Sequence, residues 1–222
     1  LVSVDLLKQA AKLLEHQVKF RLKGMNKAKV GLRLAVIHML DQQFEKALST
    51  IKISRWRNLP DGLSTERRHL EARILAKLDK PEEALKVLVG DITEEASLIR
   101  VDLHWQMRGW QAVIQTQADI LGDVWNSSDA LTEAQRKYVM RMAVGMALDG
   151  NEVGLDQLRS DYVAKMVGTP DAEGFDVITK KVDKESTQFR KVAGAIAQID
   201  TLETLMTRYR DKLKGDNLVK AN

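Results

Sequence analysis

The 222-residue chain has no cysteine, three prolines and an aromatic content of only 5%. The absence of cysteine excludes disulfides, cysteine-ligated zinc sites and thiol catalysis. It does not define the compartment, because a cysteine-free chain folds in reducing and in oxidising surroundings. No apolar run approaches the ~20 residues that span a bilayer, and no signal-peptide pattern is present. We therefore expect no membrane span, and both the cytoplasm and the cell envelope stay open as locations.

Charge of either sign is also not in large excess. The chain has 35 lysines and arginines against 31 aspartates and glutamates, a net charge of +4. The basic residues are mostly interleaved with acidic ones. We therefore favour a solvated surface of mixed charge over a nucleic-acid footprint.

Five segments of the chain align as the same helix–turn–helix. A small residue in one helix is followed nine positions later by the residue that opens the turn, and twelve positions later by a small or apolar residue. With the residue three positions after the first, each segment gives an aligned quartet. The quartets are Ala35/His38/Phe44/Ala47, Ala72/Leu75/Pro81/Ala84, Val101/His104/Trp110/Val113, Ala143/Met146/Glu152/Leu155 and, less clearly, Ala193/Ile196/Leu202/Leu205. One such unit cannot bury its apolar face alone, so the repeat predicts stacked helix pairs that share a continuous core.

Helix-capping residues precede the expected helices. The candidates are Ser3, Asn26, Ser64, Thr93, Thr132 with Gln135 as a capping box, Thr169 before Pro170, and Asp200 with Glu203. The first helix, ending before Gly24, has an apolar stripe that we expect to pack on the next helix. The residues of this expected contact are Leu6, Leu13, Leu14 and Val18 on the first helix and Leu32, Val36 and Met39 on the second. No segment has the length and turn chemistry of a paired strand.

The segments 43–48 and 80–85 resemble the turn and second helix of the tetratricopeptide repeat (TPR), with its aromatic-x-x-Ala pattern. Ala35 and Ala72 stand where that family has the small residue of its first helix. The family's first aromatic residue is absent, and the ~34-residue period is not kept. The resemblance implies an all-α fold, a right-handed α–α superhelix (a solenoid of antiparallel helix pairs). It implies a capping helix or half-repeat at 1–24, TPR-like pairs at 25–118, and divergent repeats continuing the solenoid at 119–222.

The whole chain also resembles the C-terminal part of large bacterial repeat proteins. Its first residue is Leu1 and not methionine. We therefore expect a bacterial protein whose chain is trimmed or cut from a longer polypeptide.

Residues in catalytic or metal-binding arrangements are missing. The four histidines, at 16, 38, 69 and 104, are scattered and lack the spacing of ligand pairs. Serines fall at caps and in loops, and no nucleophile elbow, phosphate-binding loop or dinucleotide motif occurs. We predict no enzyme activity, no catalytic residue, no cofactor and no metal.

One helix face is the candidate binding surface. Trp105 follows the inward His104 by one position, a rotation of about 100° around the helix, toward the expected concave groove. The expected groove residues are Glu66, His69, Arg73, Lys77, Leu98, Asp102, Trp105 and Gln106. This mixed surface with one aromatic residue suits a peptide or protein segment better than a phosphate backbone.

We therefore expect a non-catalytic protein–protein interaction scaffold that binds a peptide or partner protein in the concave groove. A nucleic-acid-binding solenoid is a less favoured alternative, suggested by the pI of about 9.2 and by Arg55-Trp56-Arg57 in a predicted loop. A second alternative is a structural or assembly segment of a larger envelope-associated protein. Its surfaces would contact other parts of the same polypeptide.

Overall fold

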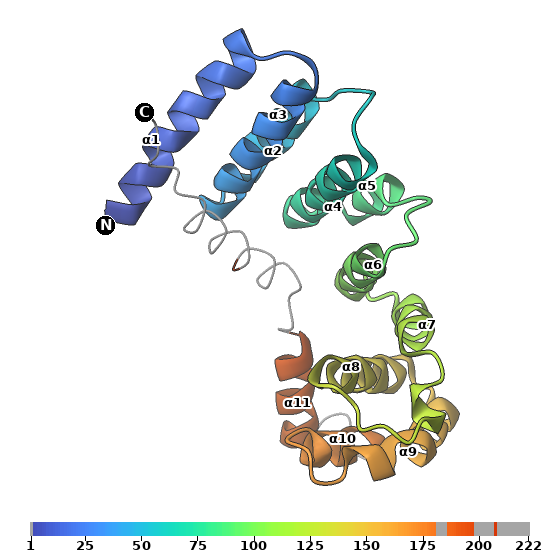
Figure 1. Ribbon diagram of the computed structural model, residues 1–222. Coiled ribbons are helices and arrows are strands. Elements are labelled where there is room, and N and C mark those ends of the chain that lie inside the picture. The colour runs from blue at the N-terminus through green and yellow to red at the C-terminus, as the bar shows by residue number, and fades with distance from the viewer. Residues whose placement is uncertain (1, 181–185, 198–206, 208–222) are drawn as a thin grey trace. The chain divides into compact units, whose positions relative to one another are not determined.

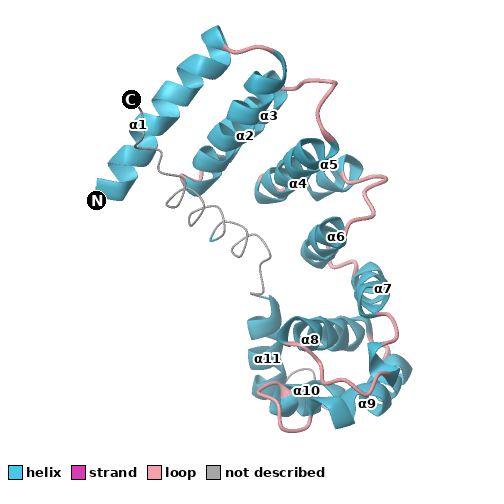
Figure 2. Ribbon diagram, in the orientation of Figure 1, coloured by secondary structure: helices cyan, strands magenta, loops and turns pink. Residues whose placement is uncertain are grey.

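The computed structural model describes residues 2–180, 186–197 and 207, and these residues form helices and loops without a strand (Figures 1 and 2). The all-α prediction is confirmed for them. In chain order the helices are α1 (Val2–His16), α2 (Gly24–Leu40), α3 (Phe44–Ile53), α4 (Asp61–Lys77), α5 (Pro81–Val87), α6 (Glu94–Gln106), α7 (Trp110–Leu121), α8 (Glu133–Asp149), α9 (Glu152–Met166), α10 (Ala172–Thr179) and α11 (Thr187–Ala197). A π-helical turn, η1 (Gln17–Arg21), continues α1, and a 3₁₀ turn, η2 (Val124–Asn126), follows α7.

None of the described helices has the length and apolar character needed to cross a bilayer. The chain divides into two compact units, and the boundary falls inside α6, between Ile99 and Arg100. Unit 1 contains α1 to α5 and the first part of α6. Unit 2 contains the rest of α6 and α7 to α11.

Four helix pairs are joined by the same hydrogen-bonded turn: α2–α3, α4–α5, α6–α7 and α8–α9. In each turn a residue just past the end of the first helix has a positive φ, the second such residue in the first three turns and the first in the fourth: Gln42 (56°), Asp79 (57°), Arg108 (58°) and Gly150 (78°). The next backbone N–H then donates to a carbonyl five residues earlier. These bonds are Gln43 to His38 (2.8 Å), Lys80 to Leu75 (2.9 Å), Gly109 to His104 (2.8 Å) and Asn151 to Met146 (2.9 Å). This is a Schellman motif, which satisfies the last carbonyls of one helix.

The four turns place the aligned residues as the repeat requires. Phe44, Pro81, Trp110 and Glu152 are each the first residue of a second helix. The small residues flanking the turns are fully buried, namely Ala35, Ala47, Ala72, Ala84, Val101, Val113 and Ala143. In the fifth segment Ala193 and Ile196 lie in α11, whereas Leu202 and Leu205 lie outside the described residues.

Helix starts are predicted with mixed success. Thr132 and Gln135 form the expected capping box, and the Thr93 hydroxyl accepts from the amide of Ala96 (3.2 Å). Four predictions are wrong because the helix begins elsewhere. α1, α2 and α4 begin before Ser3, Asn26 and Ser64, and α10 begins at Ala172, after Thr169 and Pro170. The hydroxyl of Thr169 donates instead to the Met166 carbonyl (2.7 Å), which ends the preceding helix. Asp200 and Glu203 lie outside the described residues.

The first helix packs on the second, as the apolar stripe predicts. Val18 is fully buried, and Leu32, Val36 and Met39 on α2 are nearly so. Leu14 is half-buried. Leu13 does not follow the prediction, since 61% of its surface is exposed. Leu13 lies on the side of α1 that lines a groove described below, so its apolar surface is open to a ligand and not to the core.

Candidate functional site

The eight residues of the expected groove divide between the two units. Glu66, His69, Arg73, Lys77 and Leu98 belong to unit 1, and Asp102, Trp105 and Gln106 belong to unit 2. In unit 1 Lys77 is exposed, and Glu66 and Leu98 are half-buried. His69 and Arg73 are buried, with 8% and 4% of their surface exposed. The His69 Nε2 lies 3.0 Å from an Asp91 carboxylate oxygen, and Arg73 Nη2 donates to Glu95 (2.5 Å).

The three residues in unit 2 also have interactions within the chain, and Gln106 is exposed. The Asp102 carboxylate forms an ion pair with Arg141 (2.7 Å). Trp105 is half-buried, meets Trp110 edge to face at 5.2 Å, and lies under the Arg141 guanidinium at 5.0 Å. It packs against the apolar core of α8 to α11. A partner that used Arg73 or Trp105 would have to displace these contacts, so the expected groove stays a prediction.

Asp91 is the centre of the densest polar cluster in unit 1. Its carboxylate accepts from Arg68 (3.0 Å), His69 (3.0 Å), and the amide and hydroxyl of Thr93 (3.1 and 2.7 Å). Burial alone would raise the pKa of Asp91, but these donors outweigh it and hold the pKa well below its usual range. The cluster ties the loop after α5 to α4.

This cluster does not have the geometry of a catalytic triad. In a triad one ring nitrogen of the histidine faces the carboxylate and the other faces the nucleophile. Here the same atom, Nε2 of His69, lies 3.0 Å from Asp91 and 3.3 Å from the Thr93 hydroxyl. That hydroxyl already donates to Asp91 and accepts from the amide of Ala96. The arrangement therefore fixes a loop and has no base oriented toward a nucleophile.

A buried arginine outside the Asp91 cluster joins three helices. Arg67 of α4 donates to the carbonyls of Ala28 in α2 (2.6 Å) and Ile51 in α3 (2.8 Å), and to the Ser54 hydroxyl (3.1 Å). Only 5% of its surface is exposed. The C-terminal end of α3, where carbonyls lack helical partners, is a favourable place for a cation. Arg67 therefore positions α2 and α3 against α4.

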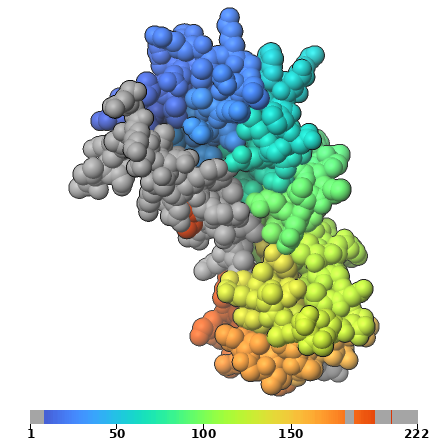
Figure 3. Space-filling model, viewed as in Figure 1, coloured from blue at the N-terminus to red at the C-terminus, as the bar shows by residue number. Residues whose placement is uncertain are grey.

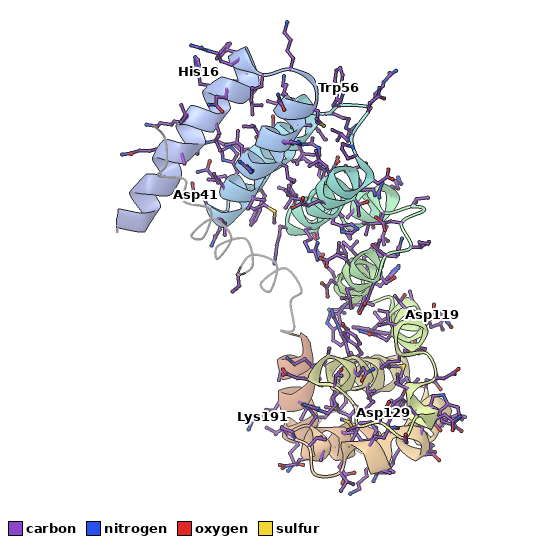
Figure 4. The ribbon with its side chains drawn as sticks, in the orientation of Figure 1. His16, Asp41, Trp56, Asp119, Asp129 and Lys191 are labelled. Carbon is purple, nitrogen blue, oxygen red and sulfur yellow. The ribbon has the colours of Figure 1, made fainter. Side chains whose placement is uncertain are left out.

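Unit 1 also carries a groove of about 590 Å³ between the end of α1, η1 and the first turns of α2. Its lining residues are Leu13, His16, Gln17, Arg21, Leu22, Asn26, Lys29, Val30 and Arg33. The four α2 residues follow the spacing i, i+3, i+4, i+7, which places them on one helix face. Figure 4 shows His16 at the end of the molecule where α1 leads into α2, with Trp56 at that same end and Asp41 at the far end of α2.

The groove is cationic, and none of the described residues that line it is acidic. Arg21, Lys29 and Arg33 are exposed, and no ion pair joins them to a carboxylate of the described residues. Glu15, the nearest acid in sequence, faces the buried His38, with 3.4 Å between His38 Nε2 and its carboxylate. Like charges gathered around a concave surface create a positive potential that attracts anions. In Figure 3, α1 and α2, whose residues line the groove, belong to the blue part of the surface.

The π-helical turn η1 forms one wall of the groove. The Leu22 amide donates to the Gln17 carbonyl five residues earlier (2.9 Å), which widens the helix by one residue at this turn. Turns of this type are often found at functional sites. Phe20, on the same turn, is 76% exposed and its ring lies 5.3 Å from that of His16. The turn therefore presents Gln17 and Arg21 to the groove and an aromatic side chain beside it.

This groove was not among the sites expected from the amino-acid sequence, although the sequence contains a signal for it. Residues 16–40 contain no aspartate or glutamate. The same stretch contains Lys19, Arg21, Lys23, Lys27, Lys29 and Arg33. The charge of the whole chain, +4, conceals this local excess because acidic residues elsewhere offset it. A count of charge along the chain would have located it.

Groups of histidine, aspartate or glutamate with the arrangement of a metal site are absent from the described part of the chain. Comparisons with known proteins do not add a family: no family model, curated protein or solved structure matches the chain.

Proposed function

We propose that this protein is a non-catalytic interaction scaffold whose helix pairs hold a protein partner, with the cationic groove of unit 1 as a contact site. The observation that carries the proposal is the contrast among its cations. Arg67, Arg68 and Arg73 have acceptors inside the fold, whereas Arg21, Lys29 and Arg33 surround a groove and have no carboxylate partner among the described residues. Exposed cations of this kind can pair with an anionic ligand.

The proposal includes the finer architecture expected from the sequence, a right-handed superhelix of helix pairs similar to the tetratricopeptide repeat. Four turns with the same Schellman bonds, and buried small or apolar residues on both sides of the first three, support it. Such a scaffold holds its binding surface rigid, so that little of the protein's own conformational freedom is lost on binding. The geometry of His69, Asp91 and Thr93 supports a role without catalysis.

A second candidate, a nucleic-acid-binding surface, has one observation in its favour. Trp56 is 48% exposed, lies 3.8 Å from the Cβ position of Gly24, and stands between Arg55 and Arg57. Exposed aromatic and basic side chains together are typical of surfaces that bind single strands. Arg55, however, already pairs with Glu71 (3.1 Å). A steep fall of oligonucleotide affinity with salt would favour this candidate.

Site-specific photo-crosslinking in the cells that make the protein tests the scaffold. A crosslinking residue replaces Lys29 in the groove, and in a matched variant it replaces Lys86, an exposed lysine of α5. We expect protein adducts from position 29, reduced by Arg33→Glu, and few from position 86. Adducts that nuclease removes would support the second candidate. Equal adducts at both positions would contradict a specific contact site.

A further inference from the structure

We infer that the cationic groove binds a short acidic peptide segment in extended conformation, with an aliphatic side chain seated between α1 and α2. The inference rests on the proposed scaffold function and names the chemistry of its ligand. Three observations support it: the three kinds of lining residue, the spacing of the cations, and the lack of aromatic side chains other than His16 among the described lining residues.

The groove combines three kinds of surface. Its apolar residues are Leu13, Leu22 and Val30, its side-chain amides are Gln17 and Asn26, and its cationic or titratable residues are His16, Arg21, Lys29 and Arg33. Hydrogen bonds from the two side-chain amides to other described residues are not present. A peptide has a partner for each of these surfaces: its apolar side chains for the apolar residues, its backbone for the amides, and its carboxylates for the cations.

The cation spacing matches an extended acidic segment. Lys29 and Arg33 lie four residues apart on α2, a rise of about 6 Å. Carboxylates on alternate residues of an extended chain are separated by about 6.6 Å and point to the same side. Two such carboxylates reach Lys29 and Arg33 together, while Arg21 on the opposite wall faces the same space. The side chain between the two carboxylates points to the other side of the peptide.

The apolar residues account for the aliphatic part of the ligand. Leu13 of α1 lines the groove and exposes 61% of its surface. Covering such a side chain removes apolar surface from water, which favours binding. A leucine next to the acidic pair points away from the carboxylates, toward α1, and can cover Leu13 without entering the core. The groove volume, about 590 Å³, is in the range of sites for small ligands and short segments.

A single-stranded nucleic acid fits this groove less well. Its phosphates would satisfy the cations, but its bases stack mainly on aromatic side chains. Among the described residues, the lining contains no aromatic side chain other than the imidazole of His16. Phe20 packs on the outside of His16, and Trp56 lies in a separate loop by Gly24. The acidic peptide is therefore the ligand class that uses all three surfaces.

Fluorescence anisotropy with the intact chain tests the inference. The probe is a labelled Gly-Ser-Glu-Leu-Glu-Leu-Glu-Ser-Gly peptide, and the comparison probes replace its glutamates by glutamine or its leucines by serine. An oligothymidylate of equal length is the fourth probe. We expect the acidic probe to bind more tightly than each of the other three, with an affinity that falls as salt rises.

Two pairs of variants locate the binding. Arg21→Glu with Arg33→Glu reverses two groove charges, and Lys52→Glu with Lys86→Glu reverses two exposed charges of unit 1 outside the lining. We expect the groove pair to weaken the acidic probe by at least about tenfold and the control pair to change it by less than about twofold. Arg21→Gln with Arg33→Gln repeats the test with neutral residues if the reversed pair melts early.

Each of the other outcomes would overturn one part of the inference. Tighter binding of the oligothymidylate, lost in the groove pair, would replace the peptide by nucleic acid as the ligand class. Equal binding of the leucine and serine probes would remove the aliphatic anchor. Equal losses in both variant pairs would remove the groove. Should the peptide fail while crosslinks from position 29 persist, the ligand chemistry is wrong and the scaffold function stands. If the peptide does not bind and position 29 gives no crosslinks, the ligand chemistry and the scaffold function are both wrong.

Discussion

Unit 1 contains two clusters of basic residues with opposite roles. On α4, Arg67 donates to backbone carbonyls of two other helices, and Arg68 and Arg73 pair with Asp91 and Glu95. At the start of α2, Lys29 and Arg33 are exposed and have no such partners among the described residues. The first cluster stabilises the fold, and the second contributes charge to a surface.

The comparison teaches that the number of basic residues does not indicate their role. A buried cation without acceptors is costly, and the buried Arg67 and Arg73 of α4 each have an acceptor within the chain. Exposed cations need no partner because water solvates them. Substitutions in the two clusters should therefore separate stability from binding.

The largest effect is expected from Arg67→Ala. The change removes donors from the Ala28 and Ile51 carbonyls and from the Ser54 hydroxyl, in a place that water does not reach. We expect the free energy of unfolding to fall by about 3 kcal/mol or more. Urea melts measure it, with Arg33→Ala as the control, expected within about 0.5 kcal/mol of wild type. Similar losses in both variants would erase the distinction between the two clusters.

The next largest effect concerns the side of α2 opposite its exposed cations. Gly31 is buried, and a Cβ there would lie 2.1 Å from Ser54 Oγ and 2.3 Å from Ser54 Cβ at the end of α3. Gly31→Ala should lower the free energy of unfolding by about 2 kcal/mol through overpacking. Thermal or urea melts check this. The double variant Gly31→Ala with Ser54→Gly relieves the clash and should recover part of the loss, and no recovery would argue against this cause.

Asp91→Asn tests the α4 cluster through pH. The folded-state pKa of Asp91 lies well below the usual value, so its contribution is fully present above the unfolded-state pKa, about 4, and is lost as pH falls toward the folded pKa. At neutral pH we expect the variant to be less stable by about 1–2 kcal/mol. Urea melts from pH 7 down to pH 3 should show the gap between variant and wild type narrowing below pH 4. A gap that stays constant would contradict the charge-based role.

The smallest effect on stability is expected in the groove. Lys29→Gln with Arg33→Gln removes two charges that no carboxylate of the described chain offsets. The free energy of unfolding should stay within about 0.5 kcal/mol of wild type at physiological salt. At low salt it should rise slightly, because repulsion with Arg21 is relieved and less screened. A clear loss of stability in melts at both salt levels would mean that the groove cations have structural partners.

The features predicted correctly from the sequence depend on neighbouring residues along the chain. The quartet around Ala72 and Ala84 marked a turn whose hydrogen bonds span five residues, and Thr132 with Gln135 marked a cap that spans three. The wrong predictions, at Asn26 and Ser64, were also local. Each residue has good capping chemistry, but α2 and α4 begin two or three residues earlier. Capping preference is weaker than the contacts that extend a helix.

The candidate site was less predictable because its residues owe their roles to distant partners. Trp105 was expected to face a groove by its position on the helix, and its neighbour Arg141 comes from α8. Arg73 was expected to bind a ligand and is paired with Glu95. The groove at Leu13, Arg21 and Arg33 arises where a π-helical turn brings two helix faces together.

The helices, the repeated turns and the local excess of positive charge follow from residues a few positions apart in the sequence. Packing in three dimensions selects which cations have acceptors in the fold and which are exposed to water. That choice depends on whether packing brings an acceptor within hydrogen-bond distance of a buried guanidinium, as Ala28 and Ile51 do for Arg67. Where packing leaves the charge in water, as at Arg33, the fold gains nothing from it and a ligand can.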